Sequence, residues 1–125
     1  MSGLVLDSSA ILAYTQRKSA VAPLLGEVSS VVLPALALAE TRAELAYKEE
    51  LFLLSLLTSR LPHVLVAPLS AGDAVGVGRL AAMLDGRLGL AHAVAEAHRR
   101  EALLLTAYGK AVRKAIGELD GIVDL

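Results

Sequence analysis

The sequence has 125 residues, which is long enough for one domain with a real core and too short for two ordinary domains. Its formal net charge is −1, so no global positive field attracts nucleic acid, and any such contact must use local cations. It contains no cysteine, which excludes disulfides and thiolate metal sites and fits a cytoplasmic protein.

Neither a membrane span nor a signal peptide is expected. The longest apolar run, residues 31–39, contains Pro34 and is far shorter than the roughly 20 residues that a membrane-spanning helix needs. The first residues lack a basic region and carry Asp7 early, which argues against a signal peptide. We therefore expect no membrane contact.

Residues 4–6 are apolar and run directly into Asp7, Ser8 and Ser9. Because they show no polar alternation, they predict a strand covered on both faces, as in a parallel sheet. Ligands gather outside the carboxyl ends of such strands, which makes Asp7 a candidate site residue. The alternative is that Asp7 only caps the helix that we expect over 11–17.

A second acid follows the next predicted strand. After a short helix over 19–26 that should end at its glycine, residues 30–33 predict a buried strand closed by Pro34. Pro34 suits the first turn of a helix that should run to about Lys48. Glu40 lies on that helix directly after five apolar residues, and it is either a second site residue or part of a solvated outer face.

The remaining elements alternate between helices and strands. We expect helices at 51–57, from Ser70 onward, at 88–99 and at 111–116, and strands at 63–68, 102–105 and 121–124. Because parallel neighbours need a crossover between them, this alternation predicts a three-layer α/β fold, with a mainly parallel central sheet flanked by helices.

Two of these helices carry unusual patterns. The helix at 51–57 is apolar almost all round, which we interpret as a contact with a partner rather than central core, because a small domain has limited room to bury every face. The helix at 88–99 places Leu90 on an apolar side and puts His92 and Glu96 next to each other on a polar stripe.

Taken together, these stretches resemble the PIN domain, in particular the short VapC-type toxins of bacterial toxin–antitoxin pairs. Residues 6–10, with Asp7, look like the family's opening strand and first acid. Residues 33–40, with Glu40, look like its second strand, helix start and second acid. The resemblance covers nearly the whole chain and implies a single PIN-like domain over 1–125.

The family's third and fourth acids are replaced in this sequence. Residues 88–93 match the helix that normally carries the third acid, and His92 stands where the family usually has aspartate. Residues 104–108 match the strand end that normally carries the fourth acid, and Tyr108 stands in its place after Thr106 and an alanine.

The resemblance implies that Asp7 and Glu40 are catalytic residues and metal ligands, supported by Ser8 and Thr106. Clustered carboxylates in such nucleases bind Mg²⁺ or Mn²⁺, and the metal activates water and offsets charge on the scissile phosphate. Two carboxylates could still hold one ion weakly through water. A chain that has lost catalysis would need no metal.

His92 has three interpretations. It is a solvated surface residue, a metal ligand in a rebuilt site, or a neutral side chain paired to Asp7 or Glu40 where the metal once lay, and we favour the last. Glu96, one turn further on, is a possible substitute acid. Tyr108 is a poor metal ligand at neutral pH, because a phenol ionises only near pH 10.

The implied function is that of a PIN-domain protein of the VapC-type ribonuclease toxin lineage, with Mg²⁺- or Mn²⁺-dependent RNA cleavage weakened or lost. The alternative is a non-catalytic PIN-like binding or dimerisation protein. Expected partners are a second copy of the chain, an antitoxin protein and RNA. Side chains that could contact phosphates are Arg42, Arg79, Arg87, Arg99 and Arg100.

Overall fold

The structure is a computed structural model that describes residues 3–18, 20–117 and 121–125. Its strands are β1 (Gly3–Leu6), β2 (Ser30–Pro34), β3 (Val64–Ala67), β4 (Leu103–Thr106) and β5 (Ile122–Asp124). Its helices are α1 (Ser8–Thr15), α2 (Val21–Glu27), α3 (Ala35–Glu44), α4 (Lys48–Ser59), α5 (Ala71–Met83), α6 (Leu88–Arg100) and α7 (Gly109–Ile116).

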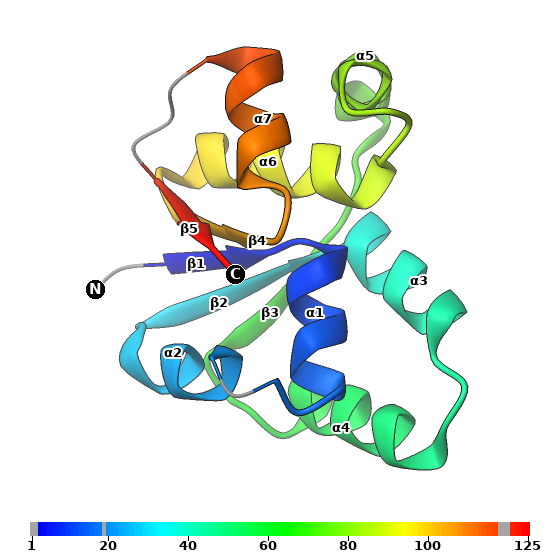
Figure 1. Cartoon of the computed structure of the whole chain (residues 1–125), viewed down its shortest axis with the longest axis vertical. Coiled ribbons are helices and arrows are strands. Elements are labelled where there is room, and N and C mark those ends of the chain that lie inside the picture. The colour runs from blue at the N-terminus through cyan, green and yellow to red at the C-terminus, as the bar shows by residue number, and fades with distance from the viewer. Residues whose placement is uncertain (1–2, 19, 118–120) are drawn as a thin grey trace.

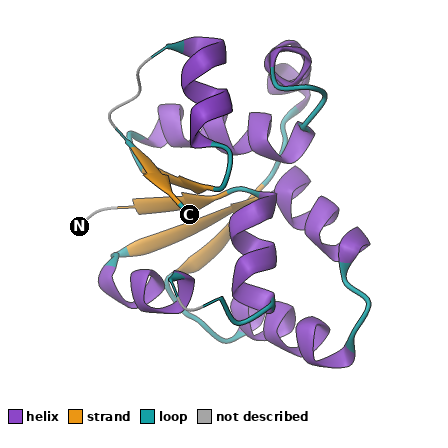
Figure 2. Ribbon diagram, viewed as in Figure 1, coloured by secondary structure: helices purple, strands orange, loops and turns teal. Residues whose placement is uncertain are grey.

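The strands form one parallel sheet in the order β3-β2-β1-β4-β5, and helices pack on both of its faces (Figure 1). Figure 2 shows the sheet between α1, α2 and α4 on one side and α5, α6 and α7 on the other. The predicted α/β fold with a parallel central sheet is therefore confirmed.

Strand β1 lies in the middle of the sheet, where Leu4 is in register with Val31 of β2 and Leu103 of β4. Because successive side chains of a strand point to opposite faces, Leu4 and Leu6 enter one core and Val5 enters the other. All three side chains are fully buried, which confirms the doubly covered strand predicted from this uninterrupted apolar run.

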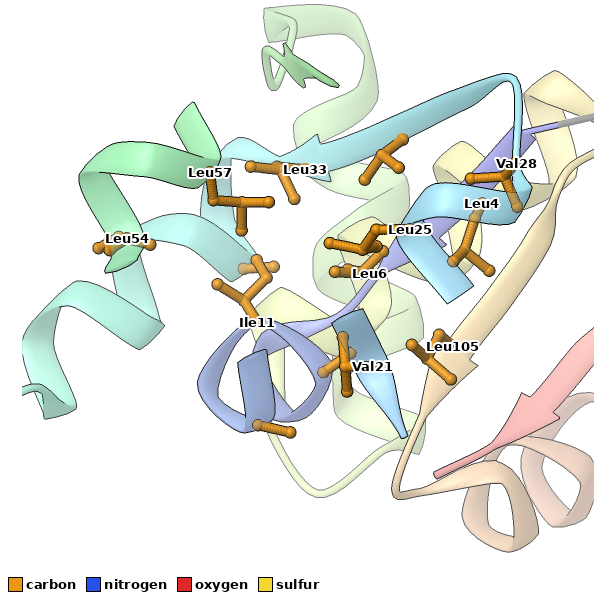
Figure 3. Close-up of a cluster of buried hydrophobic side chains, with 14 of the residues drawn as sticks. Leu4, Leu6, Ile11, Val21, Leu25, Val28, Leu33, Leu54, Leu57 and Leu105 are labelled. Carbon is orange, nitrogen blue, oxygen red and sulfur yellow. The ribbon is translucent and has the colours of Figure 1, made fainter. Parts of the chain in front are cut away.

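The first core lies between the sheet and helices α1, α2 and α4. Figure 3 shows Ile11 of α1, Val21 of α2 and Leu57 of α4 around Leu6 of β1. The second core lies on the opposite face, where residues of α5, α6 and α7 pack with Val5 of β1. Each helix therefore needs one apolar stripe, which the spacing along the sequence supplies.

Helix α3 ends earlier than predicted, at Glu44 rather than near Lys48. The reason is Leu45, which adopts an extended backbone and turns its side chain into the first core. Pro34 is the last residue of β2 and the N-cap of α3, so its missing N–H interrupts neither the sheet nor the helix.

Helix α2 continues through Gly26 and ends at Glu27, so the predicted stop at the glycine was wrong. Gly26 is not among the residues with positive φ, the conformation that glycine supplies when it ends a helix. The predicted start of this helix at Ser19 lies outside the described residues.

Helix α4 is partly core and partly surface. Leu54 and Leu57 are buried in the first core, Leu51 packs against it, and Phe52 stays 62% exposed. The nearly all-round apolar pattern of this segment is therefore only half explained by the packing of the chain on itself. No described helix is long and apolar enough to cross a membrane.

The direction of the chain across the sheet reverses between β1 and β4. Strands β2 and β3 continue to one side of β1, whereas β4 and β5 lie on the other side. Helix α1 follows β1 directly, α7 follows β4, and α3 packs against both α1 and α6 near the same end of the sheet. Ligands of open α/β sheets bind in the crevice at such a reversal, so a site is expected here.

Candidate functional site

A cleft of about 780 Å³ lies at the carboxyl ends of β1 and β4. Among its lining residues are Asp7 after β1, Glu40 on α3, Leu90 on α6 and Tyr108 after β4. The structure thus brings the two predicted acids into one cleft, at the end of the sheet where the parallel topology predicts a site.

Asp7 is buried and hydrogen-bonded through both carboxylate oxygens. Its Oδ1 accepts bonds from the Ser9 hydroxyl at 2.6 Å and from the Ala10 N–H at 2.9 Å. Its Oδ2 accepts a bond from the Thr106 hydroxyl at 2.6 Å. Asp7 is the N-cap of α1, so the capping interpretation is confirmed, and the same residue also lines the cleft.

Burial raises the pKa of Asp7 above its ordinary value, and the hydrogen bonds from Ser9, Thr106 and the backbone oppose this rise without cancelling it. The desolvation of the carboxylate therefore outweighs the donors around it.

The two hydroxyls that bond to Asp7 also hold the loop after β4. The Ala107 N–H donates to Ser9 Oγ at 2.9 Å, and the Tyr108 N–H donates to Thr106 Oγ1 at 2.9 Å. Asp7 is thus connected through one hydroxyl on each side to two successive backbone amides. This network fixes the position of Tyr108 in the cleft wall.

Glu40 is half-buried, and its Oε1 accepts two hydrogen bonds. The Ser8 hydroxyl donates at 2.6 Å, and the backbone N–H of Gly89 donates at 3.0 Å. Glu40 therefore connects the first turns of α1 and α6 to the middle of α3. Like Asp7, it has structural hydrogen bonds to nearby protein groups.

Tyr108 is 40% exposed, and the guanidinium of Arg87 lies 4.3 Å from its ring centroid. This distance is that of a cation–π contact. Arg87 also lies 3.6 Å from Asp85, which is exposed. Where the resemblance expects a fourth acid, the cleft therefore has an aromatic ring with a cation over its face.

His92 does not line the cleft. Its side chain is buried, with Nδ1 accepting a bond from the Leu36 N–H at 3.3 Å and Nε2 lying 3.7 Å from Glu96 Oε1. Burial lowers the pKa of His92, and the charge of Glu96 and a hydrogen bond to the backbone of Pro68 oppose this shift. The imidazole is paired with neither Asp7 nor Glu40.

Glu96 is also buried outside the cleft, in an ion-pair cluster on α6. Its carboxylate lies 3.6 Å from Arg99 and 3.3 Å from Arg100, and Arg99 in turn pairs with Asp73 of α5. Glu96 is thus compensated by cations and is not placed to act as a substitute acid beside Asp7. The polar stripe of this helix faces other parts of the protein rather than open solvent.

The acids of the described cleft do not form a cluster of the kind that holds metal ions in two-metal nucleases. Among the residues that the structure describes, no group of three or more histidine, aspartate or glutamate side chains could hold a metal ion. Asp7 and Glu40 accept hydrogen bonds from protein donors, and Glu44 is a third acid in the lining of the cleft. Mg²⁺ can bind through only one or two carboxylates when it keeps several of its water molecules, so a single ion here would have to be held weakly by Asp7 and Glu40.

The sequence did not reveal Leu90 as a cleft residue, because a leucine on a core-facing stripe and a leucine in a cleft wall share the same spacing. The glycine at position 89 is the sequence feature that could have indicated that this part of the helix lies close to the cleft. A Cβ at this position would overlap Ser8 Oγ, Glu40 Oε1 and the Ala37 backbone. A glycine in the first turn of a helix indicates such a close approach.

No family model matches the sequence, and a search of curated proteins finds no significant match.

Proposed function

We propose that this chain is a PIN-domain protein of the VapC-type ribonuclease toxin lineage in which metal-dependent RNA cleavage is weakened or lost. The parallel sheet in the order β3-β2-β1-β4-β5 is compatible with a PIN-like topology. Asp7 and Glu40 come from the two stretches that resemble the family most specifically, and both line the same cleft. These two observations support the lineage.

The observation that supports weakened cleavage is that Tyr108 lines the cleft where the resemblance expects a fourth acid, whereas His92 lies outside the lining. Asp7 accepts three hydrogen bonds from Ser9, Ala10 and Thr106, and Glu40 accepts two through one oxygen. In two-metal nucleases, clustered carboxylates hold the cation that activates water and offsets charge on the phosphate. Glu44 is a further acid in the lining, but the described residues include no group of three or more acidic or histidine side chains that could hold a metal ion.

The test is cleavage of a generic single-stranded RNA by the native protein in Mg²⁺ or Mn²⁺. We expect slow cleavage or none, at a rate that Glu40→Gln leaves unchanged, since the amide oxygen of the new side chain could still accept the bonds from Ser8 and Gly89. A chelator control removes background from free metal, and circular dichroism verifies that both forms are folded. Strong Mg²⁺-dependent cleavage that is lost in Glu40→Gln would overturn the proposal.

If RNA binds to the cleft, Arg87 is the one of the five candidate arginines that is placed for contact with a phosphate. It lines the cleft, whereas Arg99 and Arg100 both form ion pairs with the buried Glu96. Arg42 and Arg79 are exposed and do not line it. RNA contact in the cleft therefore depends on Arg87, beside the Tyr108 ring, and on Lys18 in the same lining, rather than on a broad basic patch.

A second candidate function is that of a non-catalytic binding or dimerisation protein, which the surface of α4 supports. Tyr47 and Phe52, at the start of this helix, are 69% and 62% exposed. Helix α4 packs on β3, an edge strand on which Leu65 and Val66 are also exposed. Exposed apolar side chains near one edge of a sheet favour a partner, which we propose is a second copy of the chain or an antitoxin.

A further inference from the structure

The first turn of α6 is the part of that helix that reaches the cleft. The N–H of Gly89 donates to Glu40 Oε1, and Leu90, the next residue, lines the cleft together with Asp7 and Glu40. Leu90 is only 2% exposed and belongs to the second hydrophobic core. Leu90 therefore contributes an apolar residue to the lining of the cleft that contains the two acids.

Two residues further along an α-helix, a side chain points about 200° away around the helix axis. His92 accordingly contacts the Leu36 backbone and Glu96, and it is absent from the cleft lining. A straight helix cannot present Leu90 and His92 to the same small space. The structure therefore offers a different third position from the one that the sequence resemblance indicates.

We propose that Leu90, rather than His92, occupies the third-ligand position of the acidic cleft, and that Leu90 and Tyr108 together close it to divalent cations. The inference rests on the proposed function, since it concerns the same cleft and the same lost metal site. It attributes the loss of metal binding to two residues, Leu90 on α6 and Tyr108 after β4.

The chemistry of the two side chains explains this assignment. Leucine supplies no ligand and leaves no polar group to hold the water molecules that Mg²⁺ retains when it binds through few carboxylates. Tyr108 places an aromatic ring in the lining with the Arg87 guanidinium 4.3 Å from its centroid, and the positive charge of Arg87 repels a second cation. Carboxylates at both positions would join Asp7 and Glu40 around one cleft.

The experiment compares cation binding by four folded forms: native, Leu90→Asp/Tyr108→Asp, His92→Asp/Tyr108→Asp and Leu90→Asn/Tyr108→Asn. Titration calorimetry with Mg²⁺ and with Mn²⁺ measures affinity without any need for activity. Removing a residue that only orients a metal ligand commonly costs about 10–100-fold in affinity, so adding two ligands should lower the Kd by about tenfold or more. We expect this gain for the Leu90→Asp pair alone.

The Asn pair controls for size and polarity without charge. The His92→Asp pair controls for net charge, since it adds the same two carboxylates but places one beside the buried Glu96. An equal gain in the His92→Asp pair, or no gain in a folded Leu90→Asp pair, would overturn the inference while leaving the proposed function intact. Tight Mg²⁺ binding and RNA cleavage by the native protein would instead overturn the proposed function.

A charge in the wall of the cleft could prevent folding, so Leu90→His supplies a second test. Neutral imidazole is less costly to place there and binds Zn²⁺. We expect Leu90→His to bind Zn²⁺ about tenfold or more tightly than the native protein, as a ligand should matter at least as much as a residue that orients one. Glu40→Gln in the same background should abolish the gain. A folded Leu90→His protein with native Zn²⁺ affinity would contradict the assignment of this position.

Discussion

The hydroxyl of Thr106 donates a 2.6 Å hydrogen bond to Asp7 Oδ2, which joins the carboxyl ends of β1 and β4 through two buried side chains. Thr106 also accepts a bond from the Tyr108 N–H, so the acid, the hydroxyl and the loop form one connected network. This relationship makes Asp7 a structural residue of the cleft, whatever chemistry the cleft performs.

The first prediction concerns the stability that this network supplies. Asp7→Ala removes the N-cap of α1 and leaves the buried Thr106 hydroxyl without its acceptor, so we expect a loss of about 2–4 kcal/mol in the free energy of unfolding. Asp7→Asn retains an amide oxygen for the cap and should lose only about 1 kcal/mol. Urea unfolding measures both values. Equal destabilisation by the two variants would contradict the role of the hydrogen bonds.

The second prediction concerns the pH dependence that Asp7 causes. Since burial raises its folded-state pKa, the folded protein binds this proton more tightly than the unfolded chain does. The resulting stability is fully present below the unfolded pKa of about 4 and is lost as the pH rises through the folded pKa. The stability of the native protein relative to Asp7→Asn should therefore fall over this range. A constant difference from about pH 3 to about pH 7 would contradict it.

The third prediction concerns His92, whose folded-state pKa is lowered by burial. The unfolded chain binds this proton more tightly, so the stability contribution is present above the unfolded pKa of about 6.5 and is lost as the pH falls through the folded pKa. Glu96, Arg99 and Asp73 are the charged groups that act on this imidazole.

His92→Asn is the matched control, since its amide oxygen can accept the bond from the Leu36 N–H but does not titrate. Relative to this variant, the native protein should lose stability as the pH falls below about 6.5. His63 and His98 are present in both forms, so their contributions cancel. Parallel pH profiles for the two proteins would show that His92 does not couple folding to protonation.

The fourth prediction concerns the close approach at Gly89. Gly89→Ala should cost about 1–3 kcal/mol, because its Cβ would overlap Ser8, Glu40 and the α3 backbone. Gly76→Ala on α5 is the control, since nothing lies within 4 Å of its Cβ position, and alanine there should stabilise the helix by about 0.5–1 kcal/mol. Thermal unfolding of both variants measures whether Gly89→Ala loses stability and Gly76→Ala gains it. A neutral Gly89→Ala would show that α6 does not pack this tightly on Glu40.

The fifth prediction concerns the exposed start of α4. If Phe52 contacts a second copy of the chain, Phe52→Ser should convert a dimer into a monomer in size-exclusion chromatography with light scattering. Val75→Ser is the control, because Val75 is similarly exposed, at 67%, but lies on α5. A native protein that is monomeric at its highest soluble concentration would rule out the homodimer and leave an antitoxin as the proposed partner.

Much of the fold could be predicted from local patterns. Residues 4–6 and 31–33 are short uninterrupted apolar runs, which are typical of a strand buried on both faces of a sheet. The end of α3 could not be predicted in this way, because Leu45 leaves the helix to reach a core formed by other segments. Helix propensity is weaker than burial of a leucine, so the tertiary contact decides the boundary.

The candidate site also has a part that the sequence predicts and a part that only the tertiary structure decides. Asp7 and Glu40 could be placed from the sequence, because a parallel sheet gathers whatever follows the carboxyl ends of its strands. The spacing along α6 also determined that Leu90 and His92 point in different directions. These are properties of a single strand or helix, and they depend on the neighbouring residues in the chain.

Only the tertiary structure decided which side of α6 meets the cleft. The N–H of Gly89 bonds to Glu40 and that of Leu36 bonds to His92, and the paired residues are 49 and 56 positions apart. Rotation of a helix about its own axis changes none of its internal hydrogen bonds. Contacts with α3 and the sheet therefore set this rotation, and with it the choice of an apolar rather than an ionisable side chain beside the two acids.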